Sequence, residues 1–190
     1  MTSPHTTASL LGTLGALVFT GVGVLQTVDP TFPGEAAFAG RNVPSALGAL
    51  LVVGLVVGLH RSGAAGDRRL VRLGLAAAAL GWVLDAVAQL VSQAMGVDYP
   101  PPYVVATVLL VFGMLPPGIA TLREGVWSGW RRWTPLVTVI CLVVASPLLG
   151  SPGVVANAAG TVWGVCWLAL GAALLTARQP TVSGAVSNER

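Results

Sequence analysis

The sequence contains no lysine, and all ten of its basic residues are arginine. Retinal and pyridoxal phosphate attach to proteins through a lysine amine, so this chain can hold neither of them covalently. Charge of both signs is also scarce: charged residues make up 9% of the 190 residues, against about a quarter in soluble proteins. A hydrophobic fraction of 54% and a mean hydropathy of +0.80 therefore predict a chain that lies in a lipid bilayer.

Sequence motifs that carry chemistry are missing as well. The chain has no glycine-rich phosphate loop, Ser/His/Asp set, Cys/His cluster or Gly-x-Ser-x-Gly elbow. Cys141 and Cys166 lie in apolar runs without Cys-x-x-Cys spacing, which predicts buried free thiols. We expect no cofactor, no metal and no enzyme activity. We expect no nucleic-acid partner either, because the arginines adjoin apolar segments and there set orientation in the membrane.

Six apolar runs are each close to the roughly 20 residues that a helix needs to cross a bilayer. They predict an all-α integral membrane bundle of six transmembrane helices, formed as one domain by residues 1–177. The polar tail 178–190 is predicted to be disordered and cytoplasmic. The predicted spans cover about 10–28, 45–60, 70–95, 104–122, 134–149 and 153–177.

The arginines predict how this bundle is oriented. With six spans, every arginine except Arg41 falls on one face of the membrane. By the positive-inside rule that face is cytoplasmic, which places the N and C termini in the cytoplasm. Abundant Ala, Gly, Val and Leu without lysine is typical of a high-GC bacterial coding sequence, so we expect a multi-pass protein of the bacterial cell membrane.

Prolines mark the predicted connections between spans. Residues 29–44 are the longest expected loop, with Pro30, Pro33 and Pro44 as breakers. Three successive prolines predict a stiff, extended connector over residues 96–103. Pro116 and Pro117 are expected to kink the fourth span.

Asp85 is the only carboxylate in the middle of a predicted span, where a charge costs about 2.5 to 3.5 kcal/mol on insertion scales. The 3.6-residue helical period places it on one face of the third span with small and amide residues. The sixth span has a similar small and polar face at the same predicted depth, so we expect the two faces to pack together. The resulting candidate polar cluster is Asp85, Gln89, Gln93, Asn157 and Thr161.

Two functions are weighed for this cluster, ahead of a third in which Asp85 serves an intramembrane enzyme that acts on a lipid. Asp85 can hold helices together through hydrogen bonds, which fits a non-enzymatic membrane interaction or structural component. Alternatively, Asp85 serves a small solute or proton-coupled transporter with an outward-facing polar cavity. An aspartyl hydrolase would require a second carboxylate, and no other predicted span contains one.

Three tryptophans lie among arginines in the connection before the fifth span. Aromatic rings at the headgroup level and arginines beside anionic lipids are ordinary membrane anchors. The expected partners are thus the bilayer and either another membrane protein or a second copy of the chain. The candidate lipid-interface anchors are Trp127, Trp130, Arg131, Arg132 and Trp133.

Overall fold

The computed structural model describes residues 4–29, 38–97, 100–149 and 154–177. Six of its helices are long and apolar enough to cross a membrane, the fifth when counted from Gly129, which confirms the predicted all-α bundle. A short 3-10 helix, η2 (Gly129–Trp133), joins the fourth and fifth of them. The long helices are α1 (Pro4–Val28), α2 (Phe38–Arg61), α3 (Arg69–Met95), α4 (Pro100–Glu124), α5 (Thr134–Leu149) and α6 (Val154–Thr176).

Three helices begin earlier than predicted, and each contains proline near its start. α1 begins at Pro4 and not at about residue 10. α2 begins at Phe38 and includes Pro44, and α4 begins at Pro100. The expectation of an extended connector up to residue 103 was wrong because the first turn of a helix needs no backbone N–H donor, so proline fits there. α4 also runs without a break through Pro116 and Pro117. Residues 30–37 and 98–99 of the predicted loops, and the tail 178–190, lie outside the described residues.

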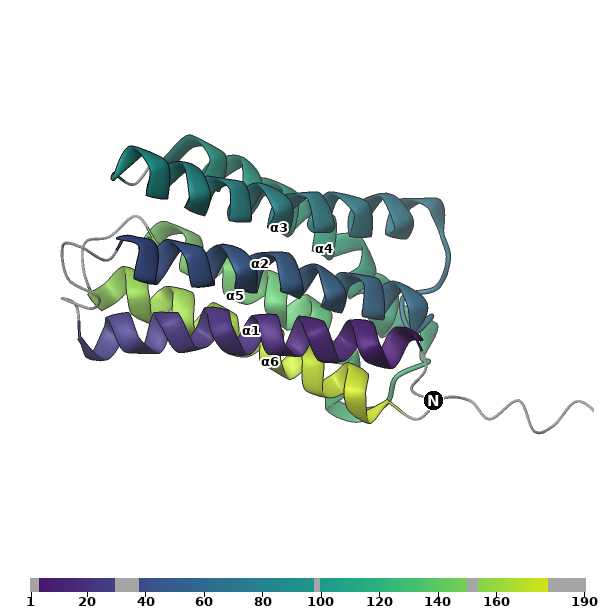
Figure 1. The fold of residues 1–190 in the computed structure, drawn as a ribbon. Coiled ribbons are helices and arrows are strands. Elements are labelled where there is room, and N and C mark those ends of the chain that lie inside the picture. The colour runs from purple at the N-terminus through teal and green to yellow at the C-terminus, as the bar shows by residue number, and fades with distance from the viewer. Residues whose placement is uncertain (1–3, 30–37, 98–99, 150–153, 178–190) are drawn as a thin grey trace, which may run out of the picture.

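The six helices form a closed ring in which each packs against its neighbours in the sequence and α6 packs against α1. Neighbouring helices run in opposite directions, and α1 begins at the same end of the bundle as α6 finishes (Figure 1). A smaller contact joins α2 to α6 across the ring. An even number of alternating helices allows every member to be antiparallel to both of its neighbours, so short connections suffice.

Glycines set the closest helix contacts. A Cβ atom added to Gly113 of α4 would lie 2.6 Å from the backbone nitrogen of Ala78 in α3, and one added to Gly74 would meet the carbonyl oxygen of Gly113. The small face of α3 therefore packs on α4, and not on α6 as the sequence pattern predicted. The glycine face of α6 packs on α1, where Gly164 meets Thr20. Small residues permit such approach in membrane helices, where packing and not hydrophobicity drives association.

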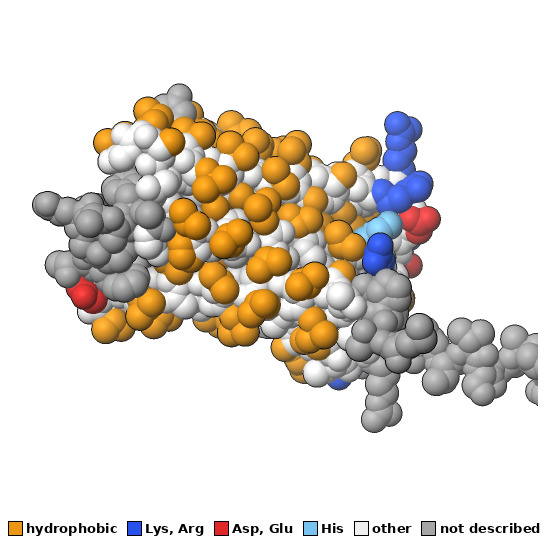
Figure 2. All heavy atoms as spheres, viewed as in Figure 1, with side chains coloured by type: hydrophobic (Ala, Val, Ile, Leu, Met, Phe, Trp, Pro, Cys, Tyr) orange, Lys and Arg blue, Asp and Glu red, His pale blue; other side chains and the backbone are white. Residues whose placement is uncertain are grey.

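The surface separates into an apolar band and a charged end. Hydrophobic side chains cover the length of the visible face, and the blue and pale-blue basic groups gather at the end where α2 finishes and α3 begins (Figure 2). Arg41 lies near the start of α2, at the opposite end of the bundle. The separation agrees with the arginine pattern on which the predicted orientation rests. The described arginines at the charged end are Arg61, Arg68, Arg69, Arg72, Arg123, Arg131 and Arg132.

Candidate functional site

Four aromatic rings from three helices meet inside the bundle; we call them the aromatic centre. Trp82 of α3 stacks on Trp163 of α6, with ring centroids 5.0 Å apart and planes 5° from parallel. Trp167, one turn after Trp163, meets Trp82 edge-on at 5.1 Å. Phe19 of α1 meets both Trp82 and Trp163 edge-on at 5.6 Å. Trp82 is fully buried, so the rings fill the space that the helices enclose.

Asp85 lies directly beside the aromatic centre. Gly81, one turn earlier, contacts Leu110 of α4, whereas Trp82 faces the aromatic centre. The helical period of 100° per residue places Asp85 between these two directions, towards α4 and the bundle interior. Its side chain is buried, and the amide of Gln89 donates a hydrogen bond to its carboxyl group. Asp85 and Gln89 thus form a buried pair, as their spacing predicts.

Several buried polar atoms in this region have no hydrogen-bond partner within the described part of the chain. They include one carboxyl oxygen of Asp85 and the indole nitrogens of Trp82, Trp163 and Trp167. Leaving a buried donor or acceptor unpaired costs about 1–3 kcal/mol. The three indole donors belong to the aromatic centre, and Asp85 follows Trp82 by one turn of α3.

The structure divides the predicted polar cluster into two groups. Asn157 donates from its amide to the carbonyl oxygen of Gln26 in α1, at 3.0 Å. The Thr161 hydroxyl donates to the carbonyl of Asn157 at 2.8 Å and lies 3.5 Å from the hydroxyl of Thr27. Asn157 and Thr161 therefore join α6 to α1 and do not contribute to the Asp85 side of α3.

Gln93 stays on α3 with Asp85, but its side-chain oxygen is buried without a partner in the described chain. α2 adds Asn42, which is fully buried, and Ser45, which is 6% exposed, at the end of the bundle where α3 finishes. Asn42 was not among the predicted intramembrane residues, because the prolines in residues 29–44 favoured the prediction of a loop there. A predicted second span that began before Pro44 would have added Asn42 to the intramembrane amides Gln89, Gln93 and Asn157.

The candidate lipid-interface anchors also separate. Trp130 and Trp133 are about half exposed, and the Arg132 guanidinium lies 5.5 Å from the ring centre of Trp133, a cation–π contact. Arg131 is half-buried. Trp127 is 5% exposed and belongs to the hydrophobic core, so it does not face lipid.

The two cysteines lie at the contact between α5 and α6. Cys141 of α5 and Cys166 of α6 are free, half-buried thiols that contact each other across the helix interface. In the described ranges, no group of three or more His, Cys, Asp or Glu side chains is arranged to hold a metal ion.

Comparison of the chain with protein-family models, with curated proteins and with solved structures finds no match. The aromatic centre with the adjoining Asp85 and Gln89 therefore stands as the candidate site on its own geometry.

Proposed function

We propose that this membrane protein is a non-enzymatic interaction or structural component. The observation that carries the proposal is the aromatic centre, because stacked and edge-on rings from α1, α3 and α6 occupy the middle of the helix ring. A solute crossing the bundle would have to separate these rings. Each aromatic pair contributes about 0.5–1.5 kcal/mol beyond its buried area, so their separation is opposed by several such terms.

The helix contacts support the same proposal. Gly74 and Gly113 bring the backbones of α3 and α4 close together, and Gly164 of α6 lies against Thr20 of α1. Carriers depend on groups of helices that move relative to one another. Such close contacts between neighbouring helices favour a rigid body that acts through its outer surface.

Two measurements on the purified full-length chain test this proposal. Native mass spectrometry of the detergent-extracted protein is expected to show a mass above that of one chain, from a second copy or another membrane protein. In vesicles that trap a pH-sensitive dye, the reconstituted protein is expected to leave an imposed proton gradient unchanged. A single-chain mass together with rapid loss of the proton gradient would contradict the proposal.

A second candidate function, proton-coupled or solute transport, is favoured by one observation. The carboxyl group of Asp85, on α3, is buried in the bundle, and one of its oxygens has no partner in the described chain. Intramembrane acids often mark proton or solute paths. In this candidate Asp85 exchanges the proton, Gln89 and Gln93 extend the polar path along α3, and Trp82 blocks the path until the bundle opens.

A further inference from the structure

A groove on the outside of the bundle, away from the aromatic centre, combines an apolar interior with a basic rim. It runs between the first turns of α3 and the last turns of α4 and has a volume of about 360 Å³. Val71 and Ala120, which are 3% and 9% exposed, form its floor. Leu70 and Ile119, which are 67% and 37% exposed, line it toward the outer surface. We call it the α3/α4 groove.

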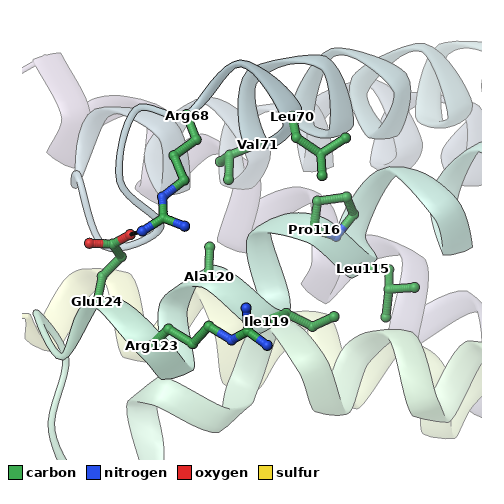
Figure 3. Close-up of a pocket in the computed structure, with 9 residues that line it drawn as sticks. All are labelled: Arg68, Leu70, Val71, Leu115, Pro116, Ile119, Ala120, Arg123 and Glu124. Atoms are coloured by element: carbon green, nitrogen blue, oxygen red, sulfur yellow. Dashed lines mark ion pairs between the residues drawn. The ribbon is translucent and has the colours of Figure 1, made fainter.

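The Arg68–Glu124 pair lies at one end of this groove, and the Arg123 side chain extends along it toward Ile119 (Figure 3). Arg68, just before α3, forms an ion pair with Glu124 at the end of α4, with nitrogen and oxygen 3.1 Å apart. Arg123 lines the groove on the α4 side, beside Ile119, and within the described chain it forms no ion pair. Two guanidinium groups and one carboxylate leave the rim with an excess of one positive charge.

The basic rim of the groove adjoins the apolar band of the bundle, and this position indicates the chemistry of a molecule that would bind there. The rim lies at the arginine-rich end of the bundle, where the hydrophobic surface of the spans gives way to charge (Figure 2). A molecule that fills the groove must therefore present a negative group to Arg123 and an apolar chain to Leu70 and Ile119. Anionic membrane lipids have both parts, and basic pockets between transmembrane helices are known to bind their headgroups.

We propose that the α3/α4 groove binds one anionic phospholipid. The phosphate lies between Arg123 and Arg68, and an acyl chain follows the groove between Leu70 and Ile119. Glu124 competes with the phosphate for Arg68, so the carboxylate limits the affinity. The site lies on a different surface from the aromatic centre and does not depend on the proposed function.

The test compares lipids and variants of the full-length chain. The protein is reconstituted into vesicles of phosphatidylglycerol and phosphatidylcholine with identical acyl chains, extracted in mild detergent, and the retained lipids are counted by native mass spectrometry. We expect phosphatidylglycerol to be retained in preference to phosphatidylcholine. Arg123→Gln is expected to lower its retention about fivefold, the factor that corresponds to about 1 kcal/mol per arginine at a membrane surface.

Three further variants separate the groove from general surface charge. Arg132→Gln removes a charge at the same end of the bundle, but from a side chain that lies over Trp133 and outside the groove, so retention should not change. Glu124→Gln should raise retention because it frees Arg68. Leu70→Gln keeps every charge and should still lower retention by making one wall polar. The melting temperature of each variant shows that it has folded.

The opposite results would overturn the proposal. Equal losses in Arg123→Gln and Arg132→Gln would indicate diffuse attraction to the charged end. Displacement of the lipid by inorganic phosphate would indicate a site for a free anion. Equal retention of the two lipids, or an unchanged count in Leu70→Gln, would show that the groove does not recognise an anionic lipid.

Discussion

At the scale of single residues, Asp85 is the side chain on which the two candidate functions differ. As a structural group it needs only its hydrogen bond with Gln89, which a neutral amide can retain. As a transport group it must release and rebind a proton. An asparagine of the same shape keeps the first property and removes the second.

Asp85→Asn is therefore expected to leave the melting temperature in detergent unchanged or higher, because a neutral amide is less costly to bury than a carboxylate. Differential scanning fluorimetry measures this effect. The same preparations are assayed for proton flux in vesicles. A flux that is present in the wild-type protein and absent in a stably folded Asp85→Asn variant would establish the transport candidate and refute the structural one.

Some residue contacts can be predicted from the sequence pattern, and others cannot. Helical periodicity correctly groups Asp85 with Gln89, because both lie on one turn of one helix. It cannot reveal that Asn157 bonds to Gln26, because that contact depends on which helix lies next to α6. The aromatic centre was missed for the same reason: Trp163 and Trp167 are one turn apart in α6, but nothing in their spacing points to Trp82.

At the scale of elements, the apolar length that a bilayer requires makes each helix predictable from the sequence. It does not indicate which helices pack against one another. A span requires about 20 apolar residues, so each run is recognised and its C-terminal end is placed within a few residues. Errors concentrate near prolines, because proline ends some helices, begins others, as Pro100 does for α4, and can lie inside a helix, as Pro44 does in α2. The pairing of α3 with α4 follows from small residues on both helices, and a glycine-rich chain offers several such faces.

The α3/α4 contact leads to a prediction about stability. Gly113→Ala should lower the free energy of unfolding by about 1–3 kcal/mol, the usual cost of overpacking. The added Cβ would meet the backbone of Ala78, which cannot turn away as a flexible side chain can. Thermal unfolding followed by circular dichroism in detergent measures the loss.

Gly21→Ala is the matched control for that substitution. Gly21 lies within α1, and an added Cβ there has no atom within 4 Å. Because alanine favours helix over glycine by up to about 1 kcal/mol, this variant should be as stable as the wild-type protein or slightly more so. Equal destabilisation by the two substitutions would mean that close helix approach at Gly113 does not hold α3 against α4.

At the scale of the whole molecule, the closed ring has consequences that no single helix has. Alternating directions bring the end of α2, the start of α3 and the end of α4 to the same end of the bundle. The arginines that are scattered along the sequence thereby gather at one end (Figure 2). This charge asymmetry is what orients a polytopic protein during insertion, so one orientation is strongly favoured.

The predicted orientation can be tested by labelling single cysteines from outside the cell. Ser128, between α4 and η2, and Val97, just after α3, are exposed at opposite ends of the bundle. A membrane-impermeant thiol reagent added to intact cells should label Val97→Cys, whereas Ser128→Cys should react only after the membrane is permeabilised. The native thiols Cys141 and Cys166 lie within spans, so the unmodified chain measures the background. Labelling of Ser128→Cys in intact cells would place the arginine-rich end outside and would contradict both the cytoplasmic termini and the positive-inside pattern.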